Sequence, residues 1–243
     1  MKIAAIIPAR YDSGRFPGKP LAKIAGITMI QRVYRQVEKT GFFSHIIVAT
    51  DHQKIAQLVK QFGGTFRITD NSHPSGTDRI WEVVESSDFD AAINIQGDEP
   101  LISEHLIRRI HNKLQTGQWP VVTAAYWNRF FGDFNSPHVV KVVVDEDFRA
   151  LYFSRSPVPF CREADFNGFY QHIGIYGYSR SALEKFVKLR QSKLEKQERL
   201  EQLRFLEHGV PIAVVESDQP SYGVDTPGDI QKIEDLLQDR TEP

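Results

Sequence analysis

Short apolar runs alternate with helix-type patterns through the first half of the chain. Residues 3–7 form one continuous apolar run, which is typical of a strand buried on both faces. Residues 28–39 place apolar side chains at helical spacing, with Thr28 as the candidate N-cap and Gly41 as the candidate stop. The same patterns predict further strands at 45–50, 65–68 and 91–95, and further helices at 53–62, 78–85 and 104–114. This alternation predicts right-handed crossovers and a mainly parallel sheet.

The pattern changes after Trp119. Residues 139–144 and 150–154 are strand-like runs on either side of a polar turn, which predicts a hairpin. The remaining expected elements are a two-faced strand at 171–178, a charged amphipathic helix at 194–208, a strand at 211–215 and a helix at 226–237. Because no linker, repeat or low-complexity segment interrupts the chain, we predict a single α/β domain over residues 1–243. Its mainly parallel, Rossmann-like sheet should carry helices on both faces, with a smaller mixed-sheet insertion at about 120–190.

Composition excludes several classes of protein. The 243 residues carry 30 Lys+Arg against 31 Asp+Glu, a net charge of -1, which argues against a broad surface for nucleic acid or anionic lipid. The single cysteine, Cys161, excludes an intrachain disulfide and fits a reducing compartment. The apolar run at the N-terminus is too short for a signal peptide, and no stretch approaches the ~20 apolar residues of a membrane span. We expect a soluble, cytoplasmic protein that binds neither nucleic acid nor membrane.

A loop rich in bases and glycines follows the first predicted strand. Residues 8–20 include Arg10, Arg15 and Lys19 together with two glycines and a hydroxyl. In open α/β sheets ligands bind beyond the carboxyl ends of the strands, where backbone N–H groups and basic side chains can hold a polyphosphate. The spacing is not that of a Walker A loop, and the chain contains no Gly-x-Gly of a dinucleotide fingerprint. The alternative, a solvated basic loop, is disfavoured by the position after a buried strand.

Two aspartates lie on predicted tight turns. Asp98 follows the strand at 91–95, and Asp225 precedes the last helix. Two carboxylates suffice to hold one Mg²⁺ that also binds substrate phosphate oxygens. For Asp225 the alternative is a helix N-cap, since Asp-Thr-Pro is a good helix start, and the sequence leaves the two interpretations open.

Seven motifs occur in order along the chain. They lie at residues 8–21, 73–79, 96–100, 150–155, 172–176, 200–204 and 224–227. Together they resemble the CMP-Kdo synthetases, the 3-deoxy-manno-octulosonate cytidylyltransferases of lipopolysaccharide synthesis. The resemblance covers about residues 3 to 235. It implies a nucleotidyltransferase fold, CTP and 3-deoxy-D-manno-octulosonate (Kdo) as substrates, and CMP-Kdo and pyrophosphate as products. It also implies Mg²⁺ as cofactor and a homodimer in which the second-half insertion supplies the contact.

The resemblance also implies roles for individual residues. The triphosphate would be held by Arg10, Ser13, Arg15 and Lys19. The nucleotide side would be lined by Ser75, Gly76, Thr77, Arg79 and Gln96. The metal would be held by Asp98 and Asp225. The sugar acid would be bound by Gln96, Arg155, His172, Tyr176, Glu201 and Gln202.

The residues themselves add to these roles or leave alternatives. Arg155 suits the acceptor's carboxylate as a bidentate cation, and its alternative is a surface base at a strand end. His172 shares a strand face with Tyr176, which favours sugar recognition over a role as general base. Glu201 and Gln202 by themselves are typical of a solvated helix face.

The sequence departs from the family pattern at two glycines. Gly14 stands where a hydroxyl residue is usual, and Gly228 where an acidic residue is usual, which puts the capping of the last helix in question. Three other functions remain open: a synthetase for the 8-amino analogue of Kdo, a metal-dependent glycosyltransferase, and a non-catalytic nucleotide-binding module. A glycosyltransferase requires an Asp-x-Asp after a strand, and the matches at 88–90 and 145–147 are more simply solvated turns.

Overall fold

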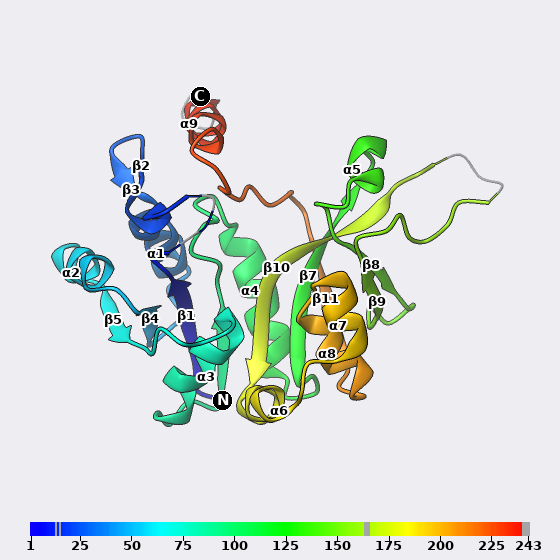
Figure 1. The fold of residues 1–243 in the computed structure, drawn as a ribbon, viewed down its shortest axis with the longest axis horizontal. Helices are drawn as coiled ribbons and strands as arrows, with labels where there is room; N and C mark the ends of the chain where they lie inside the picture. The colour runs from blue at the N-terminus through cyan, green and yellow to red at the C-terminus, as the bar shows by residue number, and fades with distance from the viewer. Residues whose placement is uncertain (13, 15, 163–165, 240–243) are drawn as a thin grey trace. The chain divides into compact units, whose positions relative to one another are not determined.

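The chain divides into two units in a computed structural model that describes residues 1–12, 14, 16–162 and 166–239 (Figure 1). Unit 1 comprises residues 1–108 and 221–243, and unit 2 comprises residues 109–220. The expectation of one domain with an insertion at about 120–190 stays a prediction.

The sheet of unit 1 is built around the first predicted strand. β1 (Ile3–Ala9) pairs in parallel with β4 (Ile46–Thr50) on one side and with β6 (Ala91–Asn94) on the other, and β4 pairs in parallel with β5 (Thr65–Ile68). The apolar side chains of β1 are buried on both faces of the sheet, as the continuous apolar run predicted.

The connections of unit 1 reverse direction beside β1. From β1 the chain moves outward through α1 (Met29–Lys39) to β4, and through α2 (Gln53–Gln61) to β5. It then returns through α3 (Gly76–Glu85) to β6 on the other side of β1. Because parallel crossovers are right-handed, this reversal places α3 on the face opposite α1 and α2. The carboxyl ends of β1 and β6 are therefore a topological switch point, where open α/β sheets bind ligands.

The C-terminal segment packs back onto the start of unit 1. Val224 and, from α9 (Asp229–Asp239), Ile233 are buried in one cluster with Ile24, Met29 and Leu101. Ile24 belongs to a two-stranded hairpin, β2 (Lys23–Ile24) and β3 (Ile27–Thr28), which follows the short helix η1 (Lys19–Leu21). This packing fixes the turn that carries Asp225.

Unit 2 holds a mixed sheet. β7 (Val121–Asn128) pairs in parallel with β11 (Ile212–Ser217) and antiparallel with β10 (Phe169–Ser179). β10 also pairs antiparallel with β8 (Lys141–Val144), and β8 pairs antiparallel with β9 (Ala150–Ser154) to form the predicted hairpin. The helices are α5 (Phe131–Asn135), α6 (Arg180–Lys188), α7 (Lys193–Glu198) and α8 (Gln202–Glu207), while α4 (Glu104–Gln115) runs from unit 1 into unit 2. The predicted mixed sheet in the second half is confirmed.

The sequence patterns missed or misplaced some elements. β7, α5 and α6 were not predicted, although Val121 to Ala125 is a β-branched and small-residue run of the kind found in buried strands. The expected helix at 194–208 is wrong as one element: Arg199 adopts a left-handed conformation with φ of 54° and separates α7 from α8. In the described part of the chain, no helix is long and apolar enough to span a membrane.

Candidate active site

A cavity of about 290 Å³ opens at the switch point of unit 1. Its walls come from the end of β1 and the loop after it, from η1, from the start of α3, and from the turn after β6. The lining residues are Pro8, Ala9, Arg10, Asp12, Lys19, Pro20, Gly76, Gln96, Gly97 and Asp98. The structure therefore brings together Arg10, Lys19, Gly76, Gln96 and Asp98, five of the residues that the sequence assigned to the nucleotide or the metal.

The loop after β1 is closed at its base. The backbone N–H of Gly18 donates to the carbonyl of Tyr11 at 2.8 Å, and Gly18 has a φ of 72°, which favours glycine. An added Cβ at position 18 would make only an ordinary contact with the Tyr11 ring at 3.5 Å, so the backbone conformation is the reason for glycine here. This closure delivers Lys19, the first residue of η1, to the cavity. Ser13 and Arg15 lie outside the described residues.

Lys19 joins the two aspartyl turns. Its ammonium donates to Oδ2 of Asp98 at 2.6 Å and to the carbonyl of Val224 at 2.9 Å, and lies 4.0 Å from Oδ1 of Asp225. The turns are also linked directly, because the N–H of Val224 donates to the carbonyl of Asp98 at 2.9 Å. Residues more than a hundred positions apart in the chain thus present two carboxylates to one cationic group.

Asp225 does not cap the last helix. α9 begins at Asp229, three positions after the expected start, and the Asp229 carboxylate accepts from the N–H of Thr226 at 2.9 Å and of Asp225 at 3.2 Å. These hydrogen bonds and Lys232 lower the pKa of Asp229 to about 2. The N-cap interpretation of Asp225 is therefore wrong. Asp229 also organises the turn beside Gly228, where the family pattern has an acidic residue.

The pair of carboxylates fits a divalent cation. Both lie within 4.0 Å of the same ammonium, so the site already gathers two negative charges around one positive centre. Mg²⁺ takes one or two protein carboxylates together with phosphate oxygens, which is the donor set that Asp98, Asp225 and a triphosphate provide. No group of three or more His, Cys, Asp or Glu side chains that could hold a metal occurs among the described residues.

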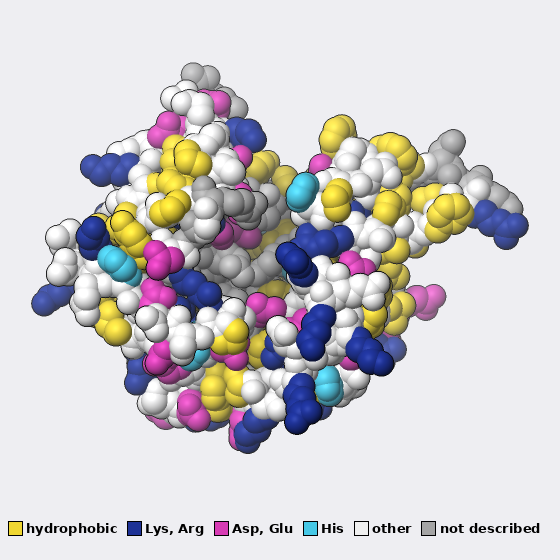
Figure 2. Space-filling model, in the orientation of Figure 1, with side chains coloured by type: hydrophobic (Ala, Val, Ile, Leu, Met, Phe, Trp, Pro, Cys, Tyr) yellow, Lys and Arg dark blue, Asp and Glu magenta, His cyan; other side chains and the backbone are white. Residues whose placement is uncertain are grey.

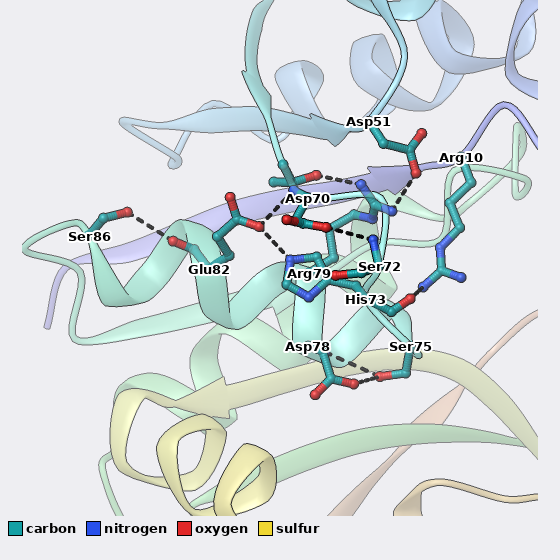
Figure 3. A network of polar contacts seen from close by, with 11 residues as sticks. Arg10, Asp51, Asp70, Ser72, His73, Ser75, Asp78, Arg79, Glu82 and Ser86 are labelled. Atoms are coloured by element: carbon teal, nitrogen blue, oxygen red, sulfur yellow. Dashed lines mark hydrogen bonds and ion pairs between the residues drawn. The ribbon is translucent and has the colours of Figure 1, made fainter.

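Arg10 is held by a polar network that reaches α3 (Figure 3). Its guanidinium donates to the carbonyl of His73 at 3.0 Å. The His73 ring pairs through Nε2 with the Glu82 carboxylate, which also accepts from the N–H of Asp70 at 2.9 Å. Because both ends of the turn are tied to Glu82, the network fixes the carbonyl that holds Arg10 beside the cavity.

The side chains of the motif at 73–79 mainly make structural contacts within the protein. Ser75 caps α3 by accepting from the N–H of Asp78 at 3.2 Å, and Thr77 is buried at 4 % exposure. Arg79 is fully buried, where it donates to Asp51 at 2.6 Å and to Thr69. The contacts of Ser75, Thr77 and Arg79 with a nucleotide stay predictions.

In unit 2, Arg155 is fixed by backbone carbonyls. Its guanidinium donates from Nε to Glu198 and from Nη1 to Pro137, both at 2.9 Å. The carbonyl of Arg155 accepts in turn from the fully buried ammonium of Lys141 at 2.8 Å. Two backbone carbonyls thus hold the Arg155 guanidinium directly after β9, and its role with a carboxylate stays a prediction.

His172 and Tyr176 lie close together on β10. Their ring centroids are 5.4 Å apart, and a register shift interrupts the ladder with β7 between Ile173 and Tyr176. Burial lowers the pKa of His172 to about 3 and raises the pKa of Tyr176 well above its usual value, so both are neutral at pH 7. A neutral imidazole fits the predicted role in sugar recognition.

Glu201 and Gln202 lie at the start of α8. The break at Arg199 turns them differently from a continuous helix: Glu201 is exposed, whereas Gln202 is 7 % exposed. Glu201 lines a second cavity of about 330 Å³ with Gln191, Glu195, Lys196, Arg199 and Leu200. Their contact with a sugar acid stays a prediction.

Sequence reasoning gave no role to two residues beside the predicted sites. Glu99, next to Asp98, is 8 % exposed, and burial with the charge of Asp98 raises its pKa to about 7. Thr123, on the unpredicted β7, is fully buried and contacts His172. The apolar run of β7 was the only sequence signal that could have placed Thr123 in a buried strand. Its contact with His172 could not be predicted, because the two residues lie 49 positions apart.

Residues 4–214 match a family model described as cytidylyltransferase. A 3-deoxy-manno-octulosonate cytidylyltransferase from Syntrophobacter fumaroxidans is 46% identical over 243 residues, covering 98% of this chain and 97% of that protein. A protein of the same name from Geobacter metallireducens is 45% identical, covering 98% of each.

Solved structures agree with these relatives. A CMP:2-keto-3-deoxy-manno-octonic acid synthetase complexed with CTP is 39% identical, with a TM-score of 0.95, covering 99% of this chain and 100% of that one. A putative glucose-1-phosphate thymidylyltransferase from Bacillus anthracis is 15% identical, with a TM-score of 0.71 and 99% of this chain covered, which speaks for the fold alone. The predicted α/β nucleotidyltransferase fold class is confirmed.

Proposed function

The chain belongs to the cytidylyltransferase family, and on this premise we propose that it joins CTP to 3-deoxy-D-manno-octulosonate, giving CMP-Kdo and pyrophosphate for lipopolysaccharide biosynthesis. The observation that carries the proposal is the convergence of Asp98 and Asp225 on Lys19, which lines the switch-point cavity together with Asp98. The relatives of about 45% identity over nearly the full chain support the choice of substrates.

The reaction is attack of a sugar hydroxyl on the α-phosphorus of CTP with loss of pyrophosphate. Such transfers need alignment of the two reactants and neutralisation of charge. Arg10 and Lys19 line the cavity, which supports a role for their charges in stabilising the departing pyrophosphate, and Ser13 and Arg15 on the same loop are proposed to share this role. Gln96 and Gly76 line the same cavity, and we propose that they contact the nucleotide.

We propose that the enzyme depends on Mg²⁺ held by Asp98 and Asp225. When bound, the ion would supply Lewis-acid charge at the α-phosphate and orient the incoming hydroxyl. The fit of the two carboxylates around one cationic centre supports this proposal. Removal of divalent metal with EDTA should abolish turnover and added Mg²⁺ should restore it; full activity in EDTA would contradict the proposal.

We assign the sugar acid to Arg155, His172, Tyr176, Glu201 and Gln202. The rigid guanidinium of Arg155 supports a role with the carboxylate. Arg155→Ala should raise the KM for the sugar acid by roughly tenfold or more, because a charge-assisted contact is lost, and should leave the KM for CTP near its original value. If neither KM changes, the sugar-acid site lies elsewhere.

We further propose a cytoplasmic homodimer. Three phenylalanines of unit 2 are exposed, Phe130 at 67%, Phe131 at 58% and Phe160 at 83%. Figure 2 shows apolar side chains gathered over α5 and the segment that leads from β9 to β10. Exposed aromatic clusters of this kind are typical of protein–protein interfaces. Cys161, exposed and without a disulfide, suits a reducing compartment.

The deciding assay follows pyrophosphate release with Mg²⁺. Kdo, its 8-amino analogue and N-acetylneuraminate are each supplied with CTP, UTP and ATP. We expect release with CTP and Kdo. Preference for the 8-amino analogue would change the assigned substrate, and absence of release with all pairs would favour a binding module or a glycosyltransferase.

A further inference from the structure

A single buried hydroxyl on β7 contacts three groups of β10. Oγ1 of Thr123 lies 2.8 Å from the carbonyl of Ile175, 3.3 Å from the carbonyl of Ile173 and 3.0 Å from Nε2 of His172. The two carbonyls belong to the bulge of β10, where the ladder with β7 is interrupted. Thr123 is fully buried, so no water competes for these contacts.

The number of available protons decides whether Thr123 donates a hydrogen bond to His172 or accepts one from it. A hydroxyl has one proton to donate and two lone pairs to accept with. The carbonyls can only accept, so the proton of Thr123 goes to Ile175, which is the shorter contact. With its proton given to Ile175, Oγ1 can only accept a further hydrogen bond. Nε2 of His172 must therefore carry the proton of their contact. The alternative leaves buried carbonyls of the bulge without their donor.

The ring nitrogen on the other side of His172 is then an acceptor. A neutral imidazole carries one N–H, and with Nε2 protonated, Nδ1 has a lone pair. The ring is held between Phe153, at 5.1 Å, and Tyr176, at 5.4 Å.

We propose that Thr123 is a positioning residue that holds His172 as its Nε2–H tautomer, so that Nδ1 accepts a hydrogen bond from a hydroxyl of the sugar acid. The inference rests on the proposed function only for the identity of that ligand. The tautomer follows from this chain alone. The low pKa of His172 supports it, since the ring then keeps one proton through neutral pH.

The test is ¹⁵N NMR of the histidine-labelled protein. In the wild type, Nε2 of His172 should resonate as a protonated nitrogen and Nδ1 as an unprotonated one, and addition of Kdo should shift Nδ1. Assignment comes from the loss of these signals in His172→Gln. An Nδ1–H pattern in the wild type would overturn the proposal, whether or not any variant folds. An Nδ1 signal that does not respond to saturating Kdo would overturn the assigned contact.

Substitutions then separate the hydroxyl from simple packing. Thr123→Val should shift His172 towards the other tautomer and raise the KM for Kdo by roughly tenfold, with the KM for CTP changed less than about twofold. Thr123→Ser, which keeps the hydroxyl, should restore both the tautomer and the KM. Equal loss in the Val and Ser variants would mean that Thr123 acts by packing alone, against the proposal.

A matched control removes a buried hydroxyl elsewhere. Thr40 is 5 % exposed and donates to the carbonyl of Val37 at 2.7 Å, and Thr40→Val should leave the His172 signals and the KM for Kdo unchanged. If Kdo and CTP give no pyrophosphate in the wild type, the proposed function fails, while the tautomer is still decided by the spectrum of the protein alone.

Discussion

At the residue scale, Lys19 explains why two distant aspartates form one site. It donates to Asp98 and to the carbonyl before Asp225, so its position depends on both turns. Its side chain is only 13% exposed, which strengthens these contacts relative to a surface ion pair. Nothing in the spacing of the three residues reveals this arrangement, because it depends on the packing of the C-terminal segment onto unit 1.

Asp98→Asn tests the metal role of the acidic pair. The amide keeps the shape of the carboxylate but loses its charge, so CTP should still bind measurably while turnover falls on the order of 10²-fold or more. Isothermal calorimetry and pyrophosphate release measure the two effects. Asp88→Asn removes a surface carboxylate paired with Lys2 and should leave both unchanged. Normal turnover in Asp98→Asn would refute the assignment.

His172 also predicts how stability depends on pH. Its folded pKa of about 3 lies below the unfolded value near 6.5, so the unfolded state binds more protons between these values. The contribution of His172 to stability is complete above about pH 6.5 and is lost as the pH falls towards 3. The free energy of unfolding, measured with urea between pH 7 and 5, should therefore fall more steeply for the wild type than for His172→Gln. The difference in slope should be at most about 1.4 kcal/mol per pH unit. Parallel declines would show that His172 titrates normally.

At the element scale, the site depends on the close approach of β1 and the turn after β6. A Cβ atom at Gly97 would lie 2.8 Å from the carbonyl of Pro8, which is too close for any side chain. The motif around Asp98 therefore needs glycine for a packing reason that only the neighbouring strand reveals. The paired turn of His73 and Glu82 similarly positions Arg10 through a backbone carbonyl.

Gly97→Ala should separate the ends of β1 and β6. We expect a loss of about 1–3 kcal/mol in the free energy of unfolding and a raised KM for CTP, because Pro8, Arg10 and Asp98 line one cavity. Thermal unfolding and steady-state kinetics measure these effects. The control is Gly223→Ala, where an added Cβ meets no atom within 4 Å. Similar behaviour of the two variants would show that the close approach is unimportant.

At the scale of the whole molecule, the proposed homodimer depends on the aromatic surface of unit 2. Phe131 packs at 5.2 Å against Phe166 while remaining 58% exposed, so the surface is an ordered cluster rather than a single side chain. A cluster of this kind buries well only against a partner, and the resemblance to the family suggests a second copy of the chain.

Phe160→Asp should convert the dimer to a monomer in light scattering after size-exclusion chromatography. The charge would otherwise be buried in the apolar contact without a partner. Ile68→Asp places the same charge on a 43% exposed apolar residue of unit 1 and should leave the mass unchanged. A monomeric wild type would contradict the proposed homodimer outright, and an unaltered dimer in Phe160→Asp would place its contact elsewhere.

The sequence by itself determined the alternation of strands and helices in unit 1, the hairpin of unit 2 and the motifs that identify the family. These features are local, because periodicity and turn residues express the burial and backbone preferences of neighbouring positions. The sequence patterns did not predict β7 and α6. They predicted α7 and α8 as one helix, because the spacing of apolar residues does not reveal the left-handed conformation of Arg199.

Only the tertiary structure decided which of two nearby carboxylates lies beside Lys19 and which one holds the turn before the last helix. Asp225 and Asp229 are four positions apart and chemically identical, and only in the folded turn does the Asp229 carboxylate accept from the N–H groups of Asp225 and Thr226. The same holds for Thr123, whose partner His172 lies on another strand. Contacts between distant residues depend on how the chain packs, and short-range patterns carry little information about that packing.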